Sequence, residues 1–127
     1  MQSQRAGYSY REPLQAEHYT DAHEIARSYR LPHDFLDSQF QGIAAASDGK
    51  IYFGMSCHAP EHNGQFYFFD PQSESLGHIN DLGTWCGENH SVGRINTHGK
   101  THSNIYEVDG VLYFSTTSGH FTKDHPY

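Results

Sequence analysis

The chain has 127 residues, of which 35% are hydrophobic, and it carries a formal net charge of −7. An acidic chain lacks the basic surface that nucleic acids and anionic membranes attract, so we expect neither as a partner. No apolar run approaches the roughly 18 residues of a membrane span, and the N-terminus has no apolar signal segment. We therefore expect a soluble protein without a signal peptide, whose compartment the sequence leaves unknown.

Residues 1–40 are expected to form an N-terminal arm with one short helix. The spacing of the apolar residues over 22–30 is that of an amphipathic helix, and Pro32 would end it. The residues with this spacing are Ala22, Ile25, Ala26 and Tyr29.

From residue 42 onward the pattern changes to short strands separated by turn residues. Asp48 and Gly49 lie between two apolar runs, which is a strong hairpin signal because glycine accepts the positive φ of the turn. Two further strands are expected over 65–69 and 76–79. Four short antiparallel strands in chain order form a meander, and this first unit spans residues 41–80.

The hairpin pattern then returns at an offset of about 61 residues, where 107–115 match 46–54 with identical Asp, Gly, Tyr and Phe. A repeated four-stranded unit is typical of propeller blades. A long connecting loop over 81–102 precedes the second unit, 103–127, which holds only a first hairpin. The predicted fold is therefore all-β: a four-stranded propeller-blade meander, a partial second blade and a short N-terminal helix.

Four segments carry a resemblance to a known superfamily: QGIAAASDGKIYFG (41–54), FFDP (68–71), CGE (86–88) and GKTHS (99–103). Over residues 40–120 the chain resembles bacterial β-propellers of the quinoprotein-dehydrogenase-like and YVTN-like superfamily. Some propellers of this appearance are polysaccharide lyases, which remove a proton beside a uronic carboxylate with a His or Tyr base and a nearby Arg or Lys. The resemblance implies a fragment of a carbohydrate-active propeller with an acidic polysaccharide or oligosaccharide as its partner.

Histidine is the unusual residue of this chain, which has 11 of them against 8 lysines and arginines. In a four-stranded blade, the loops 56–64, 81–102 and 117–127 emerge at the end away from the Asp-Gly turns. Histidines clustered at strand ends are candidates for general bases or metal ligands. The histidines in these loops are His58, His62, His90, His98, His102, His120 and His125.

Two kinds of chemistry follow from this face. As a lyase, it would use His102 as the base, His58 as its partner, and Arg94 or Lys100 to neutralise a substrate carboxylate. As a metal site, it would hold zinc or manganese. The metal candidates are His58, His90, His98 and His102, although their spacing matches no common zinc motif.

The alternative is a non-catalytic propeller module that binds a ligand or a protein through the same face. An enzyme needs a histidine and a cation converging in a concave pocket, whereas a binding module tolerates a flatter face. Cys57 and Cys86 either form a pair or remain free thiols. The partial second blade leaves the edge over 111–116 without a partner strand, so we expect self-association or a longer parent propeller.

Overall fold

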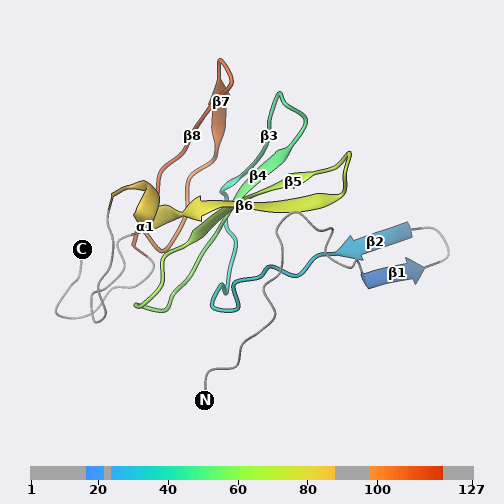
Figure 1. Ribbon diagram of the computed structural model, residues 1–127, viewed down its shortest axis with the longest axis horizontal. Helices are drawn as coiled ribbons and strands as arrows, with labels where there is room; N and C mark the ends of the chain where they lie inside the picture. Colours follow the sequence, from blue (N-terminus) through green and yellow to red (C-terminus); the bar gives the residue numbers. More distant parts are fainter. Residues whose placement is uncertain (1–16, 22–23, 88–97, 119–127) are drawn as a thin grey trace.

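The computed structural model describes residues 17–21, 24–87 and 98–118, and within them the fold is mostly β, as predicted (Figure 1). The only helix in these ranges is a single turn, so none of them contains a helix that would cross a membrane. The elements are β1 (Glu17–Asp21), β2 (Glu24–Ser28), β3 (Ile43–Ala45), β4 (Ile51–Met55), β5 (Gln65–Asp70), β6 (Ser75–Asp81), α1 (Leu82–Trp85), β7 (Tyr106–Val108) and β8 (Val111–Tyr113).

The helix predicted over residues 22–30 is wrong. Residues Glu24–Ser28 form β2, which pairs antiparallel with β1, Glu17–Asp21. A helix of nine residues is marginal on its own, because nucleation costs more than so few hydrogen bonds return. The apolar spacing of so short a segment does not decide between helix and strand, and pairing with β1 satisfies the backbone instead.

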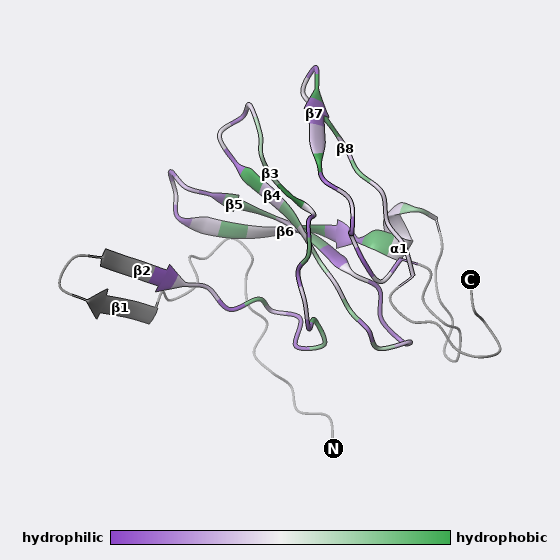
Figure 2. Ribbon diagram, turned by 180° about the vertical axis from the view of Figure 1, so that it is seen from behind, coloured by the Kyte–Doolittle hydropathy of each residue, from purple (hydrophilic) through white to green (hydrophobic). Residues whose placement is uncertain are grey.

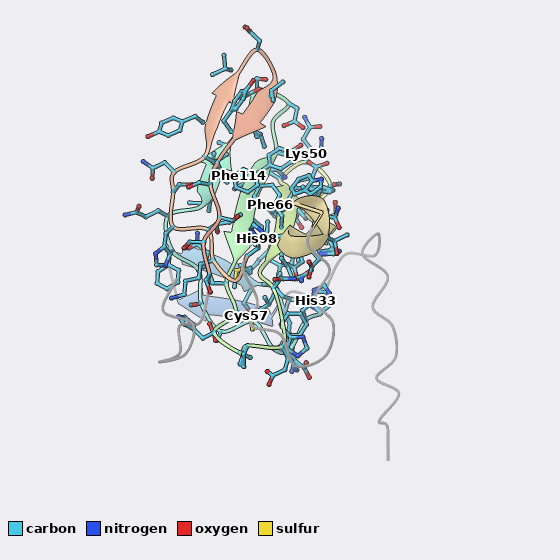
Figure 3. All side chains as sticks on the ribbon, turned by 90° about the vertical axis from the view of Figure 1, so that its left-hand side faces the viewer. His33, Lys50, Cys57, Phe66, His98 and Phe114 are labelled. Atoms are coloured by element: carbon cyan, nitrogen blue, oxygen red, sulfur yellow. The ribbon has the colours of Figure 1, made fainter. Side chains whose placement is uncertain are left out.

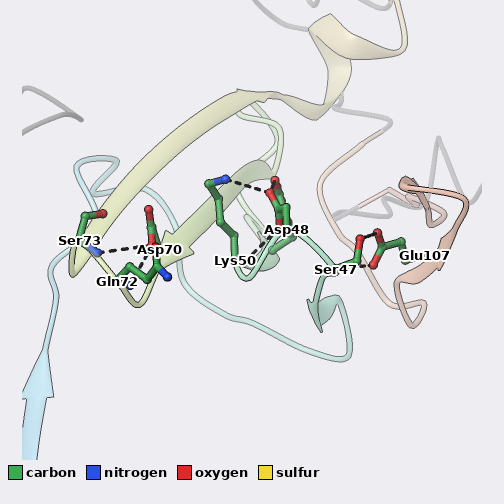
Figure 4. Close-up of polar contacts among 8 residues, drawn as sticks. Ser47, Asp48, Lys50, Asp70, Gln72, Ser73 and Glu107 are labelled. Carbon is green, nitrogen blue, oxygen red and sulfur yellow. Dashed lines mark hydrogen bonds and ion pairs between the residues drawn. The ribbon is translucent and has the colours of Figure 1, made fainter.

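The first unit is the predicted meander, a four-stranded antiparallel sheet in the order β3-β4-β5-β6. β3 and β4 are joined by the Asp48-Gly49 turn, in which Gly49 has φ +84. β5 and β6 are joined by a turn in which Asp70 accepts a hydrogen bond from the backbone N–H of Gln72, 2.9 Å (Figure 4). The four strands lie between Ile43 and Asp81.

The second unit repeats the first hairpin with a one-residue difference in its turn. Val108 pairs directly with Val111, so Asp109 and Gly110 alone form the loop, and both have positive φ. In the first hairpin the backbone bonds between Ala46 and Lys50 close a three-residue loop, and only Gly49 has positive φ. Both Asp-Gly sequences are therefore tight antiparallel turns, as predicted, but of different type.

The face of the sheet that packs on residues 98–118 is called the hairpin-side face. Its core is Phe66 and Leu82, each 1% exposed, together with Ile105 of the second unit. Phe114 stacks on Phe66 with ring centroids 4.6 Å apart and planes 5° from parallel (Figure 3). The two units thus meet at this core, and Figure 2 shows hydrophobic colour in α1 and in parts of the strands of the first unit.

A polar contact joins the two hairpins at their turn ends. Glu107 of β7 accepts a hydrogen bond from the backbone N–H of Ser47, 2.7 Å, and another from the Ser47 hydroxyl (Figure 4). Beside it, Asp48 accepts hydrogen bonds from Lys50 and Tyr52. The hydrogen bonds from Lys50 lower the pKa of Asp48 to about 2. Of these contacts, those between Ser47 and Glu107 link the two hairpins.

Glycines make room for the segment that enters the second hairpin. A Cβ at Gly42 would lie 2.6 Å from Thr101 Oγ1, and one at Gly54 only 2.2 Å from the same atom. Thr101, which is fully buried, therefore occupies a slot between two glycines of the sheet. The backbone N–H of Cys57 donates to Gly99 O, 2.8 Å, and holds this segment in place.

The opposite face, called the arm-side face, packs on residues 27–39. Tyr29 lies against Phe69 with ring centroids 5.2 Å apart, and His33 bonds the Tyr67 hydroxyl. The β7–β8 hairpin and this arm therefore lie on opposite faces of one sheet. α1, capped by the Asp81 carboxylate, falls inside the connecting loop expected over 81–102.

Candidate functional site

The candidate site begins where the arm crosses the end of β4. Ser38 and Ser56 form an isolated antiparallel bridge, with Ser56 N–H donating to Ser38 O at 2.7 Å and Asp37 N–H to Ser56 O at 3.1 Å. This bridge extends β4 beyond Met55 and places Asp37 beside His58. The bridge therefore brings together residues that are about twenty positions apart in the sequence.

Asp37 holds His58 through two hydrogen bonds. One carboxylate oxygen accepts from the His58 backbone N–H at 3.0 Å, and the other lies 2.8 Å from Nδ1 of the same residue. Desolvation opposes ionisation of Asp37, but hydrogen bonds from Ser38 and His58 outweigh it and lower the pKa of this carboxyl group. An ionised Asp37 favours the tautomer with its proton on Nδ1, which leaves Nε2 of His58 as the basic atom.

An exposed phenylalanine lies at the centre of the site. The Phe40 ring is 41% exposed, and its centroid is 4.2 Å from the His102 ring and 6.2 Å from the His58 ring. Nζ of Lys100 lies 5.6 Å from the same centroid, within cation–π range. We call Asp37, Phe40, His58, Lys100 and His102 the Phe40 cluster.

The structure brings together three of the four residues predicted for lyase chemistry. His58 follows β4 and His102 precedes β7, so both lie at the strand ends away from the Asp-Gly turns, as predicted. Lys100 joins them, since its Nζ lies 5.6 Å from the Phe40 centroid, and its backbone pairs with that of Thr117 through two hydrogen bonds, 2.9 and 3.0 Å. Arg94, the fourth, lies outside the described residues.

Three of the four predicted metal ligands, His58, His98 and His102, lie in the described ranges. His98 is half-buried, and its Nδ1 lies 2.7 Å from Thr116 Oγ1, which ties this ring to the second unit (Figure 3). The described residues include no group of three or more His, Cys, Asp or Glu side chains placed to hold a metal ion. The fourth candidate, His90, lies outside those ranges.

A second polar cluster, which the sequence interpretation missed, lies on the arm-side face. His78 Nε2 lies 2.8 Å from Gln65 Oε1, and Gln65 donates to Asp81 at 2.7 Å. The His33 ring lies 4.8 Å from that of His78 and bonds the buried Tyr67 hydroxyl. Burial lowers the pKa of both histidines, and the charge of His78 lowers that of His33 further.

Three further kinds of residue that often carry function, a histidine, a tryptophan and the cysteines, lie outside the Phe40 cluster. His62 stacks on Phe35, with ring centroids 4.2 Å apart. Trp85 packs against Phe66, with ring centroids 5.6 Å apart, and so covers the core. Cys57 and Cys86 are both free thiols, the first buried and the second exposed.

Comparison with protein-family models, with curated proteins and with solved structures gave no match. The chemistry of the site therefore rests on its own residues. The Phe40 cluster offers an apolar ring, a cation and two imidazoles on an accessible surface. One of these imidazoles is oriented by a carboxylate, which is the arrangement found in general-base pairs.

Proposed function

We propose that this chain binds an acidic saccharide of the uronate type at the Phe40 cluster. The observation that carries the proposal is the exposed Phe40 ring with Lys100 Nζ 5.6 Å from its centroid and His102 at its edge, 4.2 Å away. An aromatic ring offers apolar contact area to a sugar, with a polar partner needed beside it. Lys100 supplies the charge that pairs with a carboxylate.

The net charge of −7 does not exclude an anionic ligand at this place. Charges separated by more than about 8 Å are largely screened at physiological salt, so nearby groups decide the local potential. The one carboxylate in the cluster, Asp37, is engaged by the two hydrogen bonds to His58. Lys100 is therefore the cation available to a ligand that lies against Phe40.

The proposal extends to the architecture: the two units are successive blades of a propeller-like array. What supports this is the meander order of β3 to β6, the repeated hairpin, and the packing of Leu112 and Phe114 of that hairpin against the core of the first sheet. In such an array the Phe40 cluster lies on the loop-bearing end of two adjacent blades, where long loops on a rigid scaffold carry function.

The binding proposal is tested by calorimetric titration with an oligouronate and with a neutral oligosaccharide of the same length. We expect binding of the acidic ligand only, and a loss of about tenfold in affinity, about 1.4 kcal/mol, for Lys100→Met. Lys50→Met is the matched control, because Lys50 pairs with Asp48 at the Asp-Gly turn, at the other end of the strands. Equal losses in the two variants, or equal binding of both sugars, would overturn the proposal.

Proton abstraction is a second candidate function, favoured by the Asp37–His58 pair. His58 Nε2 would take the proton from C5 of a uronate, beside the carboxylate that Lys100 neutralises. The C5–H electrons then form the C4=C5 double bond as the C4–O bond breaks, and the departing oxygen takes a proton from His102 or water. No oxidant or metal is required.

The two candidates separate in one assay that follows the ultraviolet absorbance of the new double bond. A lyase gives rising absorbance with wild type, a strong loss in His58→Gln, a partial loss in Asp37→Asn and no change in Lys50→Met. Saturable binding without any rise in absorbance excludes the lyase candidate and leaves the binding proposal intact.

A further inference from the structure

The second hairpin carries an unusual apolar surface on the side away from the first sheet. Its four large apolar side chains form two cross-strand pairs, Tyr106 with Tyr113 and Val108 with Val111. They are 63%, 56%, 55% and 51% exposed, respectively. We call these four residues the outer face. A contiguous apolar surface of this kind usually marks an interaction site.

A second apolar surface lies at the other end of the same stack, on the arm-side face of the four-stranded sheet. There the arm and the strands enclose an open hollow of about 460 Å³, and Arg27 of the arm is among the residues that line it. We call this hollow the groove. The sheet residues that line it are Ile43, Ile51, Phe53, Met55, Phe69 and Leu76.

The contact between the two units of one chain serves as a template for a contact between the outer face and the groove. At the offset of 61, Leu112 and Phe114 of the second unit correspond to Ile51 and Phe53 of the first. Leu112 and Phe114 pack against the hairpin-side face, where Phe66 stacks on Phe114. In the first unit, the corresponding Ile51 and Phe53 line the groove instead.

The outer face of the second unit corresponds to the hairpin-side face of the first unit. Tyr113 corresponds at the same offset to Tyr52, and Tyr52 packs against the core on the hairpin-side face that receives the second unit. The outer face therefore carries a tyrosine like the one on the hairpin-side face, which is the surface that the second unit packs on. The groove carries Ile51 and Phe53, which correspond to the two residues with which the second unit makes that contact. A second copy can therefore offer its groove to the outer face of the first copy, or its outer face to the groove of the first copy.

We propose that copies of this chain associate head to tail, with the outer face of one copy docked in the groove of the next. The contact repeats between copies the packing that the two units make within a copy. It is heterologous, so it closes into a ring or grows into a filament according to the rotation per step. Neither surface contains a residue of the Phe40 cluster, so this assembly does not depend on the proposed ligand.

The outer face and the sheet side of the groove are apolar, and the one charged residue that lines the groove, Arg27, is already paired with Glu74. These features set the salt dependence of the association. Each copy carries a net charge of −7, so copies repel one another. None of the four outer-face side chains carries a charge, so no ion pair of theirs is lost when salt screens that repulsion. Association therefore strengthens as the salt concentration rises.

The test uses light scattering on size-exclusion fractions of the full chain and two complementary variants. Val111→Lys disables the outer face, and Ile43→Lys disables the groove. Both positions are more than half exposed, at 51% and 54%, so neither change buries a charge. Gln72→Lys, on the exposed β5–β6 turn, is the control for added charge, and thermal unfolding verifies that each variant is folded.

We expect wild type and Gln72→Lys to form oligomers, and each of the two interface variants alone to be monomeric. Mixing Val111→Lys with Ile43→Lys restores a 1:1 pair, because each variant keeps the one surface that the other has lost. A monomeric wild type overturns the proposal. So does an Ile43→Lys variant that still self-associates, or a mixture that remains monomeric.

Discussion

Gly54→Ala tests whether the glycine slot positions the segment that carries Lys100 and His102. The added Cβ would lie 2.2 Å from Thr101 Oγ1, 2.6 Å from Thr101 Cγ2 and 2.9 Å from Thr101 Cβ. Ordinary carbon contacts are about 3.5–4.0 Å, so Thr101 would have to retreat by about 1 Å. Its backbone is held, because Gly99 O accepts from the sheet at 2.8 Å.

The size of the effect follows from two opposing contributions. Overpacking of a close-packed interior costs about 1–3 kcal/mol. Alanine in place of glycine restricts the unfolded chain and returns about 0.4–1 kcal/mol. We therefore expect Gly54→Ala to lower the free energy of unfolding by about 1–2 kcal/mol, which is a fall in Tm of roughly 3–10 °C for a chain of this size.

The assay is thermal and urea unfolding of a double-mutant cycle with Thr101→Ala, which removes the atoms at 2.2 and 2.6 Å. In the Thr101→Ala background, Gly54→Ala should cost clearly less than in the wild-type background, because only the contact with the Cβ of residue 101, at 2.9 Å, remains. The same cost in both backgrounds would refute the clash as its cause. Gly54→Ala should also weaken saccharide binding, whereas Thr101→Ala should restore it in the double variant.

Three further predictions follow from the buried polar groups. Thr101→Val should leave stability unchanged or raise it by up to about 1 kcal/mol, because the buried Oγ1 has no hydrogen-bond partner among the described residues; a clear fall in Tm would contradict this. Stability should decrease as the pH falls through about 6.5, the unfolded histidine pKa, because the lowered pKa values of His33 and His78 keep them neutral in the fold while the unfolded chain takes up protons. Urea titrations at several pH values measure this, and a slope unchanged in His78→Gln would be inconsistent with it. Iodoacetamide should label exposed Cys86 rapidly and Cys57 only on unfolding, because burial raises the pKa of the Cys57 thiol; two equally fast thiols would argue against the packing.

The sequence predicted the meander and the second hairpin because their signals are local. Asp48-Gly49 and Asp109-Gly110 each lie between apolar runs, and a turn that requires positive φ leaves few alternatives. The predicted helix over 22–30 failed because its pattern is short and its competitor is a non-local partner strand. The difference in turn type is also non-local, since the register across each hairpin decides it.

The sequence predicted the histidines of the candidate site but not the arm residues beside them. Strand direction alone placed His58 and His102 at one end of the sheet. Asp37 and Phe40 could not be assigned, because only the pairing of the arm with Ser56 brings them there. The cluster of His33 and His78 was missed for the same reason: the arm folds over the strand that carries His78, and no spacing in the sequence encodes that contact.

The most direct test of the Phe40 cluster as a binding site is a ¹H–¹⁵N NMR titration of the full chain with an oligouronate. We expect saturable amide shifts confined to residues 37–40, 57–59 and 99–103, with the neutral oligosaccharide leaving these signals unmoved. Shifts centred on other segments, or none at saturating ligand, would contradict the assignment of this cluster as the site.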